Sequence, residues 1–389
     1  MRRSTEGNSR RTAAFAILRW RTTGEFPSAF LPSGPDRAFV QDLVYTVVRR
    51  LRALRLVLGE LVKKWPKGEM EALLYVGAAQ MLYMDDVPDF AAVHETVEAA
   101  KMCGNPSVAK VVNGVLRNLS RRREEFLSRL SGMPLEVRES YPTGLVVEWR
   151  ERFGEDGAAR LAAWHNEPAE TFLAYPDGRF ERLARGVRVE EVEGFAEGAF
   201  IVQDPATALA VEAMDVRPGE RVLDACAAPG GKTIQLAWRG AEVAACEVNP
   251  KRRLRLEENL ARAGLAGKVA VAGALPSAGE AFDKVLVDAP CSNTGVLRRR
   301  PDARWNWSRE RRDALVKLQA EILDSCAPLV KPGGRLIYST CSNDAAENAA
   351  QAAAFLARHR EFEMAGERES VPFETRHDGA YAAAFVRRA

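Results

Sequence analysis

The first third of the chain shows the spacing of apolar residues that is typical of amphipathic helices. Between residues 10 and 123, apolar side chains recur at steps of three and four, as Leu43, Val47 and Leu51 illustrate. Residues at these steps lie on one face of an α-helix. Glycine and proline gather in short breaks near residues 24–35, 66–68 and 104–106. The pattern predicts a compact helical domain.

The periodicity weakens between about residues 132 and 207. Residues 145–149 and 158–163 favour helices, whereas residues 171–175 and 187–189 have the composition of short strands. The two strand candidates lie on either side of Pro176-Asp-Gly178, which is typical of a tight turn. This part of the chain is therefore expected to mix helix and strand.

From about residue 208 onward, short apolar runs alternate with amphipathic stretches. Candidate strands are residues 220–226, 241–247, 268–273, 283–288 and 334–340. Such alternation implies a mostly parallel sheet with helices on both faces. Ligands of these sheets bind beyond the carboxyl ends of the strands. The residues directly after each run are therefore the candidate site residues.

Length, charge and cysteine content narrow the class of protein. A chain of 389 residues is long for one hydrophobic core, which favours two or three domains. The net charge of +3 is too small to name a partner, although arginines cluster at 121–123 and 298–300. A single cluster of this kind is more often a solvated helix end. The six cysteines show no Cys-x-x-Cys or paired-histidine spacing, so neither zinc nor a disulfide framework is indicated.

The sequence shows no signal for a membrane or for export. No apolar run approaches the ~20 residues of a membrane helix, and the arginine-rich start lacks the apolar core of a secretory signal. We therefore expect a soluble, cytoplasmic protein that binds no membrane and no metal. We also expect a monomer.

A glycine-rich turn follows the first strand of the predicted sheet. The sequence Asp224-Ala-Cys-Ala-Ala-Pro-Gly-Gly-Lys-Thr233 runs directly into an apolar helical stretch. Such a turn exposes backbone N–H groups at a helix start, and its glycines let a ligand approach the main chain. A nucleotide-like cofactor is therefore expected here. A phosphate-binding P-loop would need glycine at position 226, where this chain has Cys226.

Two further strands lead into motifs that contain cysteine. Asp288-Ala-Pro-Cys-Ser292 follows one strand, and Tyr338-Ser-Thr-Cys-Ser342 closes another. Because neighbouring parallel strands end at the same sheet edge, Cys291 and Cys341 are expected there together. An ATPase has no use for that pair, which argues against the P-loop interpretation.

At these residues the chain resembles the RNA 5-methylcytosine methyltransferases of the Nol/Nop/Sun family. The motifs that match, in order, are Asp224–Thr233, Asp288–Ser292 with Gly295, Pro301–Trp305, and Tyr338–Ser342 with Glu347 and Asn348. The helical first third resembles the NusB-like RNA-binding domain that is fused to this family's bacterial small-subunit rRNA enzyme. The segments that carry this second resemblance are residues 36–39, 43–49, 93–101 and 112–117. Together the resemblances imply a helical NusB-like domain (1–130), a small α+β subdomain (131–207) and a Rossmann-like methyltransferase domain (208–389).

The resemblance also implies S-adenosylmethionine as the methyl donor. Glu247 ends the second strand, where Rossmann-like folds hydrogen-bond a ribose diol. The cofactor contacts of the family carry over to Cys226, Ala227, Ala228, Pro229, Gly230, Gly231, Lys232, Glu247, Arg252 and Asp288. Ala274 departs from the pattern, because family members have an Asp after the third strand that meets the adenine amino group. Losing that hydrogen bond predicts weak binding of S-adenosylmethionine.

The chemistry of cytosine methylation requires a well-placed cysteine. Carbon 5 of cytosine is a poor nucleophile, so a thiolate must first add to carbon 6. A base must later remove the proton from carbon 5, and a second cysteine can serve. By resemblance, Cys341 is the nucleophile, Cys291 serves the release step, and Asp288 hydrogen-bonds the cytosine ring nitrogen. The predicted function is methylation of carbon 5 of a cytosine in RNA, with small-subunit ribosomal RNA as substrate.

The segment Arg298–Ser308 joins basic and aromatic side chains directly after the Cys291 motif. That composition suits phosphate contact and base stacking, and the arginines are expected to contact RNA. Trp305 is equally compatible with a place in the core. The target base must enter a pocket, which implies base flipping or a single-stranded loop. A non-catalytic RNA-binding assembly factor on the same fold, motivated by Ala274, is the alternative function.

Overall fold

The computed structural model describes residues 8–277 and 281–389 of the chain. It forms two compact units, one comprising Met1–Val147 with Arg304–Asn306 and the other Glu148–Ala303 with Trp307–Ala389. The three domain ranges implied by the resemblance stay a prediction. Each unit is described by itself below.

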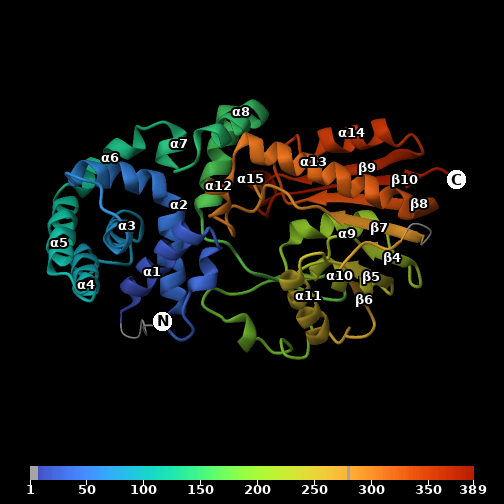
Figure 1. The fold of residues 1–389 in the computed structure, drawn as a ribbon, viewed down its shortest axis with the longest axis horizontal. Coiled ribbons are helices and arrows are strands. Elements are labelled where there is room, and N and C mark those ends of the chain that lie inside the picture. The colour runs from blue at the N-terminus through green and yellow to red at the C-terminus, as the bar shows by residue number, and fades with distance from the viewer. Residues whose placement is uncertain (1–7, 278–280) are drawn as a thin grey trace. The chain divides into compact units, whose positions relative to one another are not determined.

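The first unit is helical, as the apolar spacing predicts. Its helices are α1 (Ser9–Thr23), α2 (Arg37–Leu61), α3 (Glu69–Tyr83), α4 (Asp89–Lys101), α5 (Pro106–Arg121), α6 (Arg123–Ser131) and α7 (Leu135–Arg138), with a 3₁₀ turn η1 (Pro27–Phe30) after α1. Every residue from Ala72 to Leu82 in α3 is buried, which indicates a helix packed on all sides. Figure 1 shows α3 inside the group formed by the others. A Cβ at Gly77 would lie 2.4 Å from Leu116 Cδ1, so this glycine lets α5 pack closely on α3.

Arg304 and Trp305 also belong to the core of the first unit. Trp305 Nε1 donates to the Val48 carbonyl at 2.7 Å, and its ring packs against the core. Arg304 is 0% exposed, donates to the Arg49 carbonyl at 3.1 Å and faces the Tyr141 ring. Burial lowers the pKa of Arg304 to about 10. Trp305 is therefore a core residue, and the expectation that Arg304 contacts RNA is wrong.

A small antiparallel sheet follows α8 (Thr143–Asn166), a helix that is kinked at Gly154. Its strands are β1 (Phe172–Ala174), β2 (Phe180–Arg182) and β3 (Ile201–Val202), in the order β2-β1-β3. The strand expected at residues 171–175 is confirmed, whereas the one expected at 187–189 is wrong. Gly178, with a φ of 85°, closes a tight turn, so the second strand starts already at Phe180. Val189–Glu191 instead form the 3₁₀ turn η2.

The main sheet of the second unit is mostly parallel, as the alternation predicts. Within the described residues its seven strands are β4 (Arg221–Asp224), β5 (Glu242–Cys246), β6 (Ala270–Ala272), β7 (Phe282–Asp288), β8 (Val330–Thr340), β9 (Phe362–Ser370) and β10 (Ala380–Arg387). Their order is β6-β5-β4-β7-β8-β10-β9. The first five in this order run parallel, whereas β10 is antiparallel to both β8 and β9. Each of the candidate strands in this part of the sequence is confirmed.

Helices cover both faces of this sheet, giving the three layers of a Rossmann-like fold (Figure 1). On one face, α9 (Ala208–Met214), α10 (Gly231–Trp238) and α11 (Pro250–Arg262) pack on side chains such as Val222 and Ile337. On the other face, α13 (Arg309–Cys326) and α14 (Ala349–Arg358) pack on side chains such as Leu223 and Phe385. Short helical turns elsewhere are η3 (Pro205–Thr207), α12 (Ala303–Asn306), η4 (Ala327–Leu329) and α15 (Pro372–Thr375).

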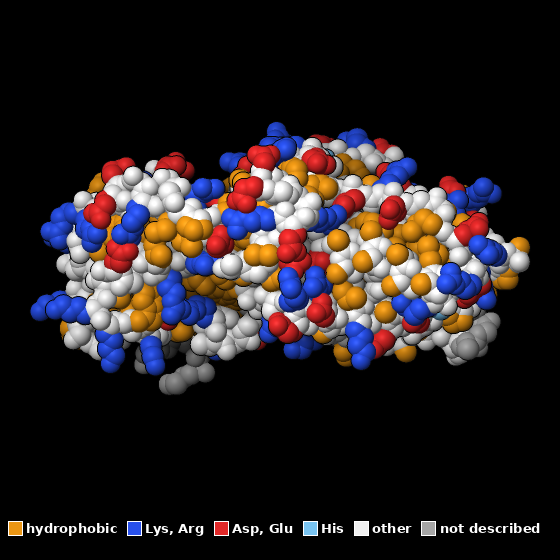
Figure 2. Space-filling view, turned by 90° about the horizontal axis from the view of Figure 1, so that it is seen from above, with side chains coloured by type: hydrophobic (Ala, Val, Ile, Leu, Met, Phe, Trp, Pro, Cys, Tyr) orange, Lys and Arg blue, Asp and Glu red, His pale blue; other side chains and the backbone are white. Residues whose placement is uncertain are grey.

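The surface mixes charges of both signs. On the face shown in Figure 2, Lys and Arg side chains alternate with Asp and Glu, with apolar side chains between them. This mixing agrees with the small net charge of +3. None of the helices in the described part of the chain is long and apolar enough to cross a membrane.

Candidate active site

The glycine-rich turn lies at the carboxyl ends of β4 and β5. It spans residues 225–230, between the last residue of β4 and the first of α10. The Ala227 N–H donates to the Cys246 carbonyl at 2.9 Å, which joins the turn to the end of β5. Gly230 has a φ of 110°, and a Cβ there would lie 2.8 Å from Leu256 Cδ1. The backbone conformation therefore favours glycine at this position, and a side chain there would also have to displace the end of Leu256.

A buried carboxylate begins the turn. Asp224 is 1% exposed, and its Oδ2 accepts a hydrogen bond from the Thr233 hydroxyl at 2.7 Å. Its Oδ1 is buried and has no hydrogen-bond partner among the described residues. Burial raises the pKa of Asp224 to about 6. A buried oxygen of this kind suits a ligand that brings a hydrogen-bond donor.

Glu247 follows β5 and is held by its own loop. One carboxylate oxygen accepts from the Asn249 N–H at 2.9 Å, and the other lies 3.4 Å from Arg252 Nη2. Arg252 Nη2 also donates to the Ala228 carbonyl at 2.7 Å. The structure thus brings Glu247 and Arg252 next to the glycine-rich turn, although the two lie on different elements from it.

An ion pair connects the turn to the end of β7. Lys232 Nζ lies 2.7 Å from Asp288 Oδ2. Burial alone would lower the pKa of Lys232, but the neighbouring Asp288 carboxylate outweighs it and raises that pKa above its ordinary value. Lys232 therefore stays protonated, and it links the turn to the loop that carries Cys291.

The two motif cysteines meet at the carboxyl ends of β7 and β8. Cys291 Sγ and Cys341 Sγ are 3.3 Å apart, Cys291 being buried and Cys341 partly exposed. Asn293, in the left-handed region with a φ of 60°, accepts from the Cys341 thiol at 3.3 Å and donates to the Cys291 carbonyl at 3.0 Å. The hydrogen bond with Cys341 and burial raise the pKa of Cys291 well above its ordinary value. Cys291 therefore keeps its proton at neutral pH in this arrangement of the two thiols.

The arginines after the Cys291 loop are bound within the protein. Arg299 donates to Asp204 at 2.7 Å, to Asp378 at 2.5 Å and to the Glu170 carbonyl at 2.7 Å. Arg298 is 7% exposed and lies over an aromatic ring of α8. The expectation that these two arginines contact RNA is wrong, because segments distant in sequence already bury or bind their guanidinium groups.

The spacing of the motifs does not predict how the two cysteine loops are held together. Ser292 and Ser342, each directly after a cysteine, both hydrogen-bond the Glu347 carboxylate. A serine repeated after each cysteine is the sequence signal that could have indicated this bridge. Ala274, by contrast, lies exposed after β6 and offers only a methyl group there.

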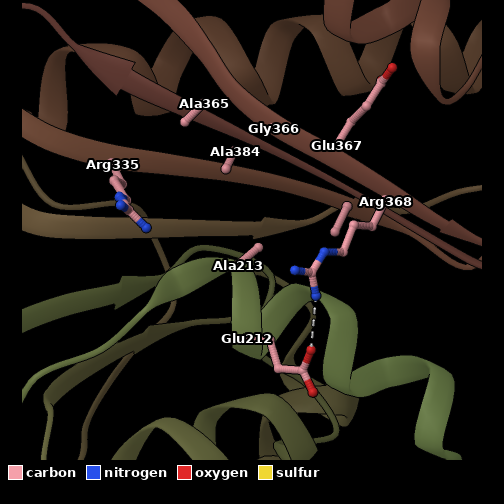
Figure 3. Close-up of a pocket in the computed structure, with 9 residues that line it drawn as sticks. Glu212, Ala213, Arg335, Ala365, Gly366, Glu367, Arg368 and Ala384 are labelled. Carbon is pink, nitrogen blue, oxygen red and sulfur yellow. Dashed lines mark hydrogen bonds and ion pairs between the residues drawn. The ribbon is translucent and has the colours of Figure 1, made fainter.

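A hollow of the second unit lies between α9 and strands β8–β10 (Figure 3). It has a volume of about 410 Å³, and Glu212 and Arg368 form an ion pair at 3.3 Å on its wall. None of the predicted site residues is among the described residues that line it. Across the described ranges, no group of three or more His, Cys, Asp and Glu side chains could hold a metal ion.

Comparison with known proteins relates these features to one group. The family model for the 16S rRNA methyltransferase RsmB/F matches residues 211–383, and the NusB family model matches residues 7–121. Ribosomal RNA small subunit methyltransferase B of Cronobacter sakazakii is 33% identical, with 98% of this chain and 99% of that protein covered. The protein of the same name from Vibrio vulnificus is also 33% identical, with 98% and 100% covered.

A solved structure shares the fold along the whole chain. The crystal structure of PH0851 matches with a TM-score of 0.79 at 22% identity, covering 99% of this chain and 100% of that one. At this identity the likeness concerns the fold alone. The family, in contrast, follows from relatives that match in sequence over nearly their full length. This chain therefore belongs to the RsmB/F family of 16S rRNA methyltransferases and carries a NusB-family region at its N-terminus.

Proposed function

We propose that this protein transfers a methyl group from S-adenosylmethionine to carbon 5 of a cytosine in 16S ribosomal RNA, through a covalent bond between Cys341 and the base. The observation that carries the proposal is the pair of sulfurs 3.3 Å apart at the ends of two neighbouring strands. Addition at carbon 6 and release at carbon 5 are two steps on adjacent ring atoms, and one sulfur can serve each.

The residues around the glycine-rich turn fit S-adenosylmethionine. Asp224 Oδ1, buried without a partner among the described residues, can accept a hydrogen bond from the amino group of the methionine part. Glu247 offers a carboxylate for the ribose diol. A Cβ at Gly231 would lie 3.1 Å from Gln203 Nε2, so the turn has little room for side chains of its own. When bound, S-adenosylmethionine supplies an electrophilic methyl group; we assign residues 226–232, Glu247, Arg252 and Asp288 to hold it.

We propose an addition followed by an elimination. Cys341 gives up its proton to solvent and bonds to carbon 6 as a thiolate, and the electrons of the carbon 5–carbon 6 double bond move to carbon 5. Carbon 5 then takes the methyl group, and S-adenosylhomocysteine would be released. Asp288, held by its ion pair with Lys232, hydrogen-bonds the ring nitrogen during this attack, and that nitrogen takes up a proton from solvent. Cys291 then loses its own proton to solvent, and its thiolate removes the proton from carbon 5. The electron pair of that C–H bond restores the double bond, and Cys341 leaves carbon 6 as a thiolate.

The contact between the sulfurs gives the two cysteines an order of action. In the free protein, the hydrogen bond with Cys341 and burial hold the pKa of Cys291 high. Once Cys341 is bonded to carbon 6, it is no longer a thiol, and the hydrogen bond that holds the pKa of Cys291 high is lost. Cys291 is therefore expected to become an effective base only after the nucleophile has added.

The roles of the two cysteines can be separated by mutation. Cys341→Ala should abolish both methylation and the RNA adduct, because the nucleophile is gone. Cys291→Ala should leave a covalent adduct with RNA that survives a denaturing gel, because release fails. Cys103→Ala, which changes a cysteine of the helical unit, is the matched control and should behave as wild type. Equal activity in the Cys341 and Cys291 variants would refute the proposal.

The substrate is tested in cells that lack the gene. Bisulfite sequencing of their ribosomal RNA should show one 16S cytosine without its mark, restored by wild-type protein and not by Cys341→Ala. If no mark changes while the protein still binds RNA, the non-catalytic assembly factor becomes the better interpretation. We further propose that the NusB-family region binds the same RNA and that the protein works in the cytoplasm as a monomer.

A further inference from the structure

A buried carboxylate between the two cysteine loops has no part in the mechanism above. Glu347 lies two residues before α14 and is 0% exposed. Burial raises its pKa, against the hydrogen bonds that it accepts. Within the described residues its carboxylate is held by hydrogen bonds and not by a cation. A buried carboxylate is unfavourable unless its oxygens accept hydrogen bonds. The carboxylate of Glu347 is therefore expected to stay where its hydrogen-bond donors hold it.

The donors that reach the Glu347 carboxylate come from both cysteine loops. Oε1 accepts from the Ser292 N–H at 2.8 Å and from Gln319 Nε2 at 3.1 Å. Oε2 accepts from the hydroxyls of Ser292 and Ser342, the latter at 2.5 Å. Ser292 directly follows Cys291, and Ser342 directly follows Cys341. One carboxylate therefore joins the residues next to both sulfurs.

Glu347 is itself anchored to the sheet and to the helix layer. The Tyr338 hydroxyl, on β8, donates to the Glu347 carbonyl at 2.6 Å. Gln319, on α13, donates to Glu347 and also to the carbonyl of Pro290 at 3.0 Å, directly before Cys291. The bridge is thus part of a fixed frame, and a change at its centre is transmitted to both loops.

We infer that Glu347 is a positioning residue of the methyl transfer reaction, which sets the spacing of the Cys291 and Cys341 sulfurs by bridging the loops that carry them. It acts through Ser292 and Ser342. The inference rests on the proposed function, since that function gives both cysteines a part in the reaction. The two sulfurs must reach adjacent ring carbons, so a small shift of one loop against the other slows the chemistry even when both cysteines are intact.

Glu347→Gln tests the bridge, because it keeps the size of the side chain but puts an NH₂ group where one oxygen accepts hydroxyl hydrogens. The distance between the two sulfurs is tested by the rate of their oxidation with diamide. Diamide takes two electrons and two protons from the two thiols and leaves them joined as a disulfide. We expect this oxidation to be at least about tenfold slower in the variant, because exchange depends on access and alignment of the sulfurs. Single-turnover methylation should slow by about 10- to 100-fold, with the KM for S-adenosylmethionine within about twofold of wild type.

Two further variants separate spacing from stability. Asp204→Asn changes another buried carboxylate of the same unit, whose partners are the Arg299 guanidinium and the N–H groups of Ala206 and Asp378. It should lower the melting temperature and leave both rates unchanged. The double variant Ser292→Ala with Ser342→Ala removes the two hydroxyls but keeps the carboxylate, and it should reproduce the slow oxidation even if Glu347→Gln fails to fold.

Wild-type rates of oxidation and methylation in both the Glu347→Gln and the double serine variants would overturn the inference. So would a lower melting temperature with unchanged rates, which is the pattern expected of Asp204→Asn. If the wild-type protein methylated no cytosine, the proposed function would fail separately, and the diamide rates would still decide whether Glu347 sets the distance between the sulfurs.

Discussion

Three chain segments meet at Gly295, and adding one methyl group there should disturb the site. The Gly295 N–H donates to the Cys341 carbonyl at 3.0 Å, and the Gly295 carbonyl accepts from the Gly379 N–H at 2.8 Å. A Cβ on Gly295 would lie 2.7 Å from Gly379 Cα and 2.8 Å from the Cys341 oxygen. Both neighbours are backbone atoms, so neither can move aside by rotating a side chain.

The expected size of the effect follows from these distances. Carbon atoms in contact prefer separations of about 3.5–4.0 Å, so in Gly295→Ala the backbone must shift by about 0.7 Å or more. Overpacking of this kind costs about 1–3 kcal/mol, and in a unit of this size each kcal/mol lowers the melting temperature by about 2–4 °C. The shift also displaces the residue that carries the proposed nucleophile. Because a misplacement of about 1 Å can cost about 100-fold in rate, single-turnover methylation should fall by about 10- to 100-fold.

Gly366→Ala is the matched control. Gly366 lies on β9 of the same sheet, and nothing stands within 4 Å of the Cβ that the substitution would add. Its stability should change by less than about 0.5 kcal/mol, and its methylation rate should match that of wild type. Both variants are compared by thermal melting and by single-turnover methylation of 16S rRNA. A Gly295→Ala protein with the melting temperature and rate of the control would refute this reasoning.

Further predictions concern the cofactor, the helical core and pH. Because Ala274 gives the adenine no carboxylate, calorimetry should show weak binding of S-adenosylmethionine to the wild-type protein. Ala274→Asp should tighten this binding by about 10- to 100-fold. Submicromolar affinity in the wild type would contradict this prediction. Trp305→Phe should lower the free energy of unfolding by about 1–2 kcal/mol, because it removes the hydrogen bond to the Val48 carbonyl. RNA binding should not weaken. Lost RNA affinity at an unchanged melting temperature would instead support base stacking by Trp305. The pKa of Asp224 is raised from 3.8 to about 6 on folding, so its contribution to stability is present below about pH 4 and is lost as pH rises through 6. Asp224→Asn should therefore melt above wild type at pH 7.5, and this advantage should disappear near pH 4.

The sheet and the placement of the cysteines could be predicted because each depends on local pattern. The apolar runs that form β4, β5, β7 and β8 are short, bounded by turn residues and separated by helical stretches. Parallel strands bring the loops at their carboxyl ends to one edge of the sheet. That rule alone is sufficient to place Cys291 and Cys341 together.

Burial by distant segments could not be predicted from the same pattern. The run Arg298–Ser308 has the composition of an RNA-binding loop, yet Arg304 is enclosed by Arg49 and Tyr141, more than 150 residues earlier in the chain. Arg299 is likewise held by Asp204 and Asp378. Composition shows which side chains can bind phosphate, whereas only the tertiary structure shows which of them are already engaged. The serine after each cysteine hints at a shared role, but the bridge through Glu347 depends on the path of two loops, which the sequence pattern does not give.

The contacts around the two cysteines and the exposed charges of the protein should control two different kinetic quantities, which are the rate at saturating RNA and the KM for RNA. Each sulfur lies within three residues of a strand in the sheet core, and the two loops are bonded to each other at Gly295 and through Glu347. Arginines such as Arg299 are engaged inside the protein, so contacts with RNA phosphates must come from exposed charges that take no part in this frame. Removing such charges should raise the KM for RNA and leave the rate at saturating RNA unchanged. Substitutions at Gly295 or Glu347 should instead lower the rate at saturating RNA and leave the KM for RNA unchanged. A site carried on independent, mobile loops would not show this difference between the two sets of variants.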